Sequence, residues 1–128
     1  MKIIIYEDML HDKELFPQTK QFLEGMGIQN ERARIRIQLE RILNQGETSW
    51  VIIHHRNFEE VALLKKNFPE IKFAGYSGFV SAEQKGLNLW LTEEMKKNYD
   101  DILGDSGYAG RFIIPNYNDL HRIIGDKK

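Results

Sequence analysis

The sequence predicts an α/β domain with a doubly wound, mostly parallel sheet of four to five strands. Apolar runs too short to be helices alternate along the chain with segments whose apolar residues recur at helical spacing. The runs at 2–7 and 50–55 are continuously apolar, which favours strands covered on both faces. Strands alternating with helices form right-handed βαβ units and hence a parallel sheet. A length of 128 residues suits a single domain, residues 1–128, with one core.

The first run, 2–7, predicts a strand that ends in acid, with Glu7 followed by Asp8. A helix is predicted over residues 12–24, with Pro17 early enough to be tolerated in or near the first turn. Its apolar face consists of Leu15, Phe16, Thr19, Phe22 and Leu23. Two glycines, Gly25 and Gly27, end this helix.

Residues 28–37 fit two interpretations. Charged residues alternate with Ala33, Ile35 and Ile37, which suits an edge strand. A helix that begins after Asn30 would instead align the apolar side chains of Ile35, Leu39, Ile42 and Leu43 on one face. We favour the helix, over residues 31–45 and closed by Gly46, and leave the strand as the alternative for 28–37.

The run at 50–55 predicts a central strand that ends in His54 and His55. Asn57 is a suitable N-cap for a helix that reaches residue 67. A third strand is predicted over 71–76, and a long helix over 82–99. In an open α/β sheet, binding sites lie past the carboxyl ends of such strands.

Three glycines at 104, 107 and 110 predict a loop after the long helix. Residues 111–114 predict a fourth strand, which Pro115 stops. The last helix is expected to begin at a cap provided by Asn118 or Asn116. Its core-facing side chains are Leu120, Ile123 and Ile124.

The composition limits the classes of function. Eighteen basic and nineteen acidic residues give a net charge of -1, which argues against a surface made as a whole for nucleic acid. The chain has no cysteine, so disulfides, thiolate metal sites and cysteine nucleophiles are excluded, and a cytoplasmic location is expected. The apolar run at the start is too short for export or for spanning a membrane, so no membrane association is expected.

Several features occur in the order of a known domain. Residues 1–8 carry an apolar strand followed by an acidic pair, and the interval 27–46 has the length of a strand and a helix. Residues 63–78 carry the end of a helix and a strand closed by Tyr76-Ser77-Gly78, and residues 107–115 carry an apolar strand closed by proline. Over nearly the whole chain this order resembles the receiver domain of bacterial two-component response regulators, which has a flavodoxin-like fold and signals through protein contacts.

The departures from that pattern fall on its reactive positions. The resemblance places His54 where a receiver has its phosphoacceptor aspartate, and Ile114 where it has the lysine that pairs with the phosphoryl group. Glu7 and Asp8 keep the acidic pair that would hold Mg²⁺, and Ser77 stands at the switch hydroxyl. The resemblance therefore implies a pseudo-receiver with a degenerate phosphoacceptor pocket, which aspartate phosphorylation does not switch.

Other interpretations use the same residues. Glu7, Asp8 and His54 around a divalent cation would suit a small hydrolase or nuclease. A third, weaker interpretation has His54 accept a phosphoryl group. Neighbouring residues of a strand point to opposite faces, so His54 and His55 do not easily serve one site. We favour a non-enzymatic module without a cofactor and leave Mg²⁺ to the alternative.

Two surface features suggest partners. The interval between Ser77 and Pro115 is longer than a receiver needs, and it carries an apolar stripe at helical spacing. This stripe consists of Leu87, Trp90, Leu91 and Met95, and predicts a surface for a protein partner or for a homodimer. A basic cluster could bind phosphate or nucleic acid, but on a helix its members spread over more than one face, which favours a solvated surface. This cluster comprises Arg32, Arg34, Arg36 and Arg41.

Overall fold

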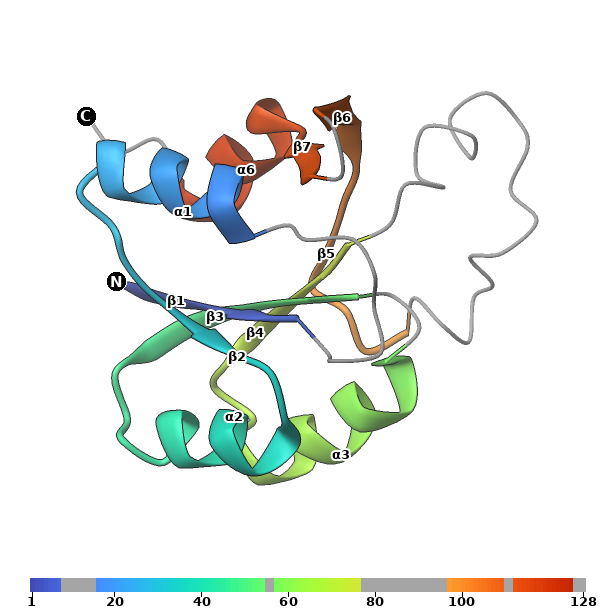
Figure 1. Ribbon diagram of the computed structural model, residues 1–128. Helices are drawn as coiled ribbons and strands as arrows, with labels where there is room; N and C mark the ends of the chain where they lie inside the picture. The colour runs from blue at the N-terminus through green and yellow to red at the C-terminus, as the bar shows by residue number, and fades with distance from the viewer. Residues whose placement is uncertain (8–15, 55–56, 77–96, 110–111, 126–128) are drawn as a thin grey trace.

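The computed structural model describes residues 1–7, 16–54, 57–76, 97–109 and 112–125. A parallel sheet lies between two layers of helices (Figure 1). One layer contains α1 (Phe16–Gly25) and α6 (Tyr117–Ile124), and the other contains α2 (Arg36–Leu43) and α3 (Phe58–Asn67). The predicted α/β fold class is thereby confirmed.

The sheet has five parallel strands in the order β2-β1-β3-β4-β5. Its strands are β1 (Lys2–Tyr6), β2 (Gln29–Ala33), β3 (Thr48–His54), β4 (Lys72–Tyr76) and β5 (Asp101–Leu103). The order reverses between β1 and β3, and in open sheets of this flavodoxin-like order ligands bind outside the carboxyl ends of the strands at the reversal. Glu7 and His54 both lie at that edge.

The core lies on both sides of the sheet. Ile3 and Ile5 of β1 face α1 and α6, where they pack with Leu23, Ile52 and Leu120. The alternate residues of β1 belong to the opposite core, on the side of α2 and α3; its other members include Leu39, Val51, Ile53, Leu64 and Phe73. Burial of both faces explains why β1 and β3 are continuously apolar in sequence.

The helix that was favoured over residues 31–45 is wrong in its first part. Residues 29–33 form β2, which pairs with β1 in a register that sets Arg32 opposite Ile5, and α2 begins only at Arg36. β2 lies at the edge of the sheet, so its outward side chains remain polar and the strand lacks an apolar signature. Ile35 was assigned to the helical stripe, but its side chain is 48% exposed.

The strand predicted over 111–114 exists, but it does not join the parallel sheet. It is β7 (Phe112–Pro115), which pairs antiparallel with β6 (Asp105–Ala109) in a separate two-stranded sheet. The fifth place in the parallel sheet belongs to β5, whose three residues follow the predicted long helix. The loop expected from the glycines at 104–110 is therefore partly the strand β6.

β5 depends on a close approach at Gly75 of β4. A β-carbon added at Gly75 would lie 3.1 Å from Ile102 Cδ1 and 3.1 Å from the ring of Tyr99. Glycine thus lets residues 99–102 pack directly on the sheet. The helix predicted over 82–99 does not extend to residue 99, because residues 97 and 98 form a turn, and its span 82–96 lies outside the described residues.

The remaining helices follow the predicted boundaries closely. α1 contains Pro17 in its first turn, and residues 12–15 of the predicted helix lie outside the described residues. α3 begins directly after Asn57. Asn116 rather than Asn118 caps α6, since its Oδ1 accepts hydrogen bonds from the backbone N–H groups of Asn118 at 3.1 Å and Asp119 at 3.3 Å. Within the described part of the chain, no helix has the length and apolarity needed to cross a membrane.

Candidate functional site at the carboxyl edge of the sheet

Glu7 follows β1 and is buried, with 7% of its surface exposed. Its Oε2 lies 2.7 Å from Nη2 of Arg32, which comes from the neighbouring strand β2. The backbone N–H of Glu7 donates to the carbonyl of Ala33 at 2.9 Å, which holds the two strand ends together. A buried carboxylate needs a paired charge, and Arg32 provides it. The carboxylate predicted as a metal ligand is therefore already neutralised by a guanidinium.

His54 is the last residue of β3 and is partly exposed. Its backbone carbonyl accepts a hydrogen bond from the hydroxyl of Tyr99 at 3.2 Å. Burial, and secondarily the negative charge of Glu60, raises the pKa of Tyr99 above its ordinary value. The hydroxyl consequently remains a donor at neutral pH and ties residue 99 to the end of the central strand. No local pattern indicates this contact, because it joins residues 45 positions apart.

Ile114 does not lie at the end of a parallel strand. It belongs to β7, where it pairs with Gly107 of the antiparallel partner β6. Its assignment to the fifth strand of the parallel sheet is therefore wrong. In this topology Leu103 ends the fifth strand and Gly104 follows it, and neither side chain carries a positive charge.

A network of ion pairs and hydrogen bonds joins both ends of β5 to α6. Arg122 donates to Asp101 through Nε at 2.9 Å and through Nη2 at 2.8 Å. Its Nη1 donates to Asp119 at 2.6 Å, and the other carboxylate oxygen of Asp119 accepts from the backbone N–H of Gly104 at 2.9 Å. Asp101 and Asp119 are thus bound to protein donors, and their arrangement is structural.

A second ion pair fixes the turn before β5. Lys65 of α3 lies 2.5 Å from Asp100, whose carboxylate also accepts from the backbone N–H of Phe73 at 2.8 Å. The backbone N–H of Asp100 returns a hydrogen bond to the carbonyl of Phe73 at 2.8 Å. These bonds hold the turn before β5 against β4, so this charged pair is also structural.

Asp8, Ser77 and the stripe Leu87, Trp90, Leu91 and Met95 lie outside the described residues. Within the residues that the structure does describe, no group of three or more histidine or acidic side chains is arranged to hold a metal ion. Of the predicted pocket, the structure therefore brings Glu7 and His54 to the same edge and adds Arg32 and Tyr99, which sequence reasoning did not assign to it.

Comparison with known proteins adds no relative: no family model, no curated protein and no solved structure matches this chain.

Proposed function

We propose that this chain is a receiver-like, non-enzymatic signalling module that acts through protein contacts and is not controlled by aspartate phosphorylation. One observation carries the proposal. The sheet has the flavodoxin-like order, and the central strand β3 ends in His54 at the edge where the neighbouring carboxylate of Glu7 is paired with Arg32.

The chemistry of that edge supports the proposal. An acyl phosphate forms on a carboxylate, and the residue that ends β3 is an imidazole. Mg²⁺ favours several hard oxygen ligands, whereas the carboxylate of Glu7 lies 2.7 Å from a guanidinium nitrogen of Arg32. A cation would have to displace Arg32 and leave its charge without this partner, which is unfavourable near a buried carboxylate.

Incubation of the purified chain with acetyl phosphate and Mg²⁺ tests the first half of the proposal. We expect the intact mass to remain unchanged. A stable increase of about 80 Da, the mass of one phosphoryl group, would contradict the proposal. The same incubation of His54→Gln identifies the acceptor, since loss of the adduct in this variant would show that His54 takes the phosphoryl group. A catalytic cation site would instead raise the melting temperature on titration with Mn²⁺.

The second half of the proposal concerns protein contacts, and the apolar stripe around Trp90 is its predicted surface. In analytical ultracentrifugation we expect Trp90→Glu to abolish self-association while the circular dichroism spectrum is kept, because a buried charge disrupts an apolar interface. Trp90→Phe serves as the matched control and should retain association. Unchanged association of Trp90→Glu, or its unfolding, would show that Trp90 does not form such a surface.

A further inference from the structure

We propose that Arg34 and Arg32 form a reversible binding site for a phosphate-type oxyanion at the carboxyl end of β2. On a helix, these arginines would have been distributed around its surface. The structure instead places Arg32 within β2 and Arg34 directly after it. Residues two apart along extended backbone lie on the same face, so the strand brings the two guanidinium groups to one side of the sheet edge.

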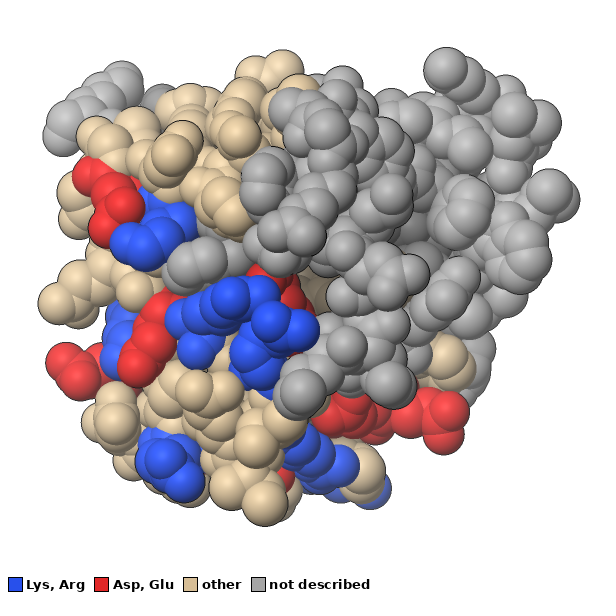
Figure 2. Space-filling view, viewed as in Figure 1, with Lys and Arg blue, Asp and Glu red and all other residues tan. Residues whose placement is uncertain are grey.

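The burial of Ala33, which lies between the two arginines, indicates on which side of the sheet they project. Ala33 is fully buried in the core on the side of α2 and α3. Arg32 and Arg34 therefore project toward the side of α1, where Glu7 meets Arg32. Ile35 still has extended backbone, with φ -135° and ψ 156°, so the alternation continues past the end of β2. Figure 2 shows lysine and arginine side chains gathered in this region, between α1 and α2.

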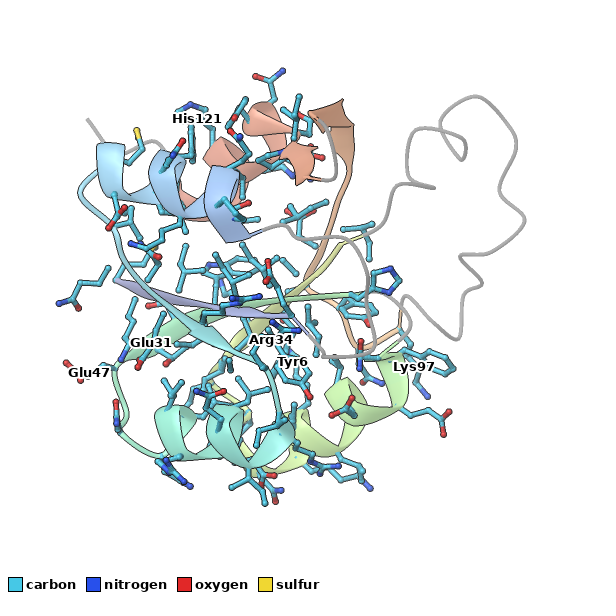
Figure 3. The ribbon with its side chains drawn as sticks, viewed as in Figure 1. Tyr6, Glu31, Arg34, Glu47, Lys97 and His121 are labelled. Carbon is cyan, nitrogen blue, oxygen red and sulfur yellow. The ribbon has the colours of Figure 1, made fainter. Side chains whose placement is uncertain are left out.

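Burial and hydrogen bonding set Arg34 apart from an ordinary solvated arginine. Its Nε has less than 1 Å² of accessible surface and no hydrogen-bond partner among the residues that the structure describes. Burying a guanidinium N–H without an acceptor is unfavourable. The backbone of Arg34 is fixed, since its N–H donates to Oε1 of Gln38 at 2.9 Å. Figure 3 labels Arg34 and Tyr6 near the carboxyl ends of β2 and β1, which pair with each other.

The local charge favours an anion. Arg32 faces the buried carboxylate of Glu7, and Arg34, two residues further along the chain, adds a second guanidinium group that has no acceptor for its Nε among the described residues. Glu7 fixes the orientation of Arg32 and so acts as a positioning residue. The planar fork of a guanidinium matches two oxygens of a phosphate, and such bidentate bonds are stronger than neutral ones. The site lies at the carboxyl ends of the strands, beside β1, which borders the reversal in strand order where open α/β sheets bind ligands.

The test is a titration of the full chain with inorganic phosphate at constant ionic strength, followed by the ¹⁵N–¹H signals of the arginine Nε groups. We expect a saturable shift of the Arg34 signal. Binding, followed through backbone amide signals near β2, should weaken about tenfold or more in Arg34→Gln, because a hydrogen bond between charged groups is lost. Arg41→Gln removes the same charge from an exposed position on α2 and should bind phosphate like the wild type.

Two results would overturn the proposal: no saturable shift in the wild type, or equal phosphate affinity in the wild type and Arg34→Gln. A phosphoserine peptide distinguishes the source of the oxyanion. Affinity comparable to that of inorganic phosphate indicates a free ligand, and much tighter binding of the peptide indicates a phosphorylated partner. The site is independent of the proposed function, since reversible binding leaves the mass of the chain unchanged and each proposal can fail alone.

Discussion

Replacement of Phe73 by alanine is expected to lower the free energy of unfolding by about 3–5 kcal/mol. Phe73 lies in β4 and has no exposed surface. It is the largest fully buried side chain among the described residues, and it packs in the core on the side of α2 and α3. Removal of the ring loses its transfer free energy and leaves a cavity that the sheet cannot close by moving one strand. The ring also lies 5.8 Å from the ammonium group of Lys65.

Urea denaturation followed by circular dichroism measures this loss. Leu63→Ala on the neighbouring helix α3 is the matched control, because Leu63 is 47% exposed and its truncation should change stability by less than about 0.5 kcal/mol. Phe73→Leu keeps most of the apolar volume and should cost less than Phe73→Ala, so it remains measurable if the alanine variant does not fold. A loss below about 1 kcal/mol for Phe73→Ala would show that β4 is not the centre of this core.

The central strands could be predicted from the sequence because strands that are buried on both faces consist of consecutive apolar residues. β1 and β3 are continuously apolar, and both lie within two residues of the predicted positions. β2 has no such signature, since an edge strand pairs on one side only and keeps polar side chains outward. β5 has only three residues, which are too few to show a periodic pattern. Its pairing with β4 depends on the missing side chain at Gly75, a condition that local periodicity does not contain.

The residues of the candidate site likewise fall into those that the local sequence predicts and those that depend on tertiary contacts. Glu7 and His54 could be predicted at one edge because each follows a recognisable apolar run. Their partners Arg32 and Tyr99 could not, since Arg32 arrives through the pairing of β2 with β1 and Tyr99 through a hydrogen bond between residues 45 positions apart. Ile114 was misplaced because an apolar run before a proline is common, and its pairing with β6 instead of β4 is a property of the whole topology.

Replacement of Asp119 by alanine is expected to lower the free energy of unfolding by about 2–3 kcal/mol. Asp119 is buried in the first turn of α6, where one carboxylate oxygen accepts from the backbone N–H of Gly104 and the other from Arg122. Alanine leaves the buried N–H of Gly104 without this acceptor at the point where β5 ends. The loss of this carboxylate affects Arg122 less than Gly104, because half of the Arg122 side chain is exposed and its bonds to Asp101 remain.

Two further variants separate the contributions of Asp119, with stability measured by urea denaturation as for Phe73. Asp119→Asn can still accept from Gly104 but loses the charge opposite Arg122, so it should cost only about 1 kcal/mol. Arg122→Gln removes the exposed partner and should cost a similar amount. If Asp119→Ala is no more destabilising than Asp119→Asn, which keeps an acceptor for Gly104, the bond to Gly104 does not hold α6 to β5. Docking of the last helix would then depend on the apolar side chains of α6 and on the bonds from Arg122 to Asp101. The expected difference between Asp119→Ala and Asp119→Asn therefore measures how far the single buried bond from Gly104 joins the short strand β5 to α6.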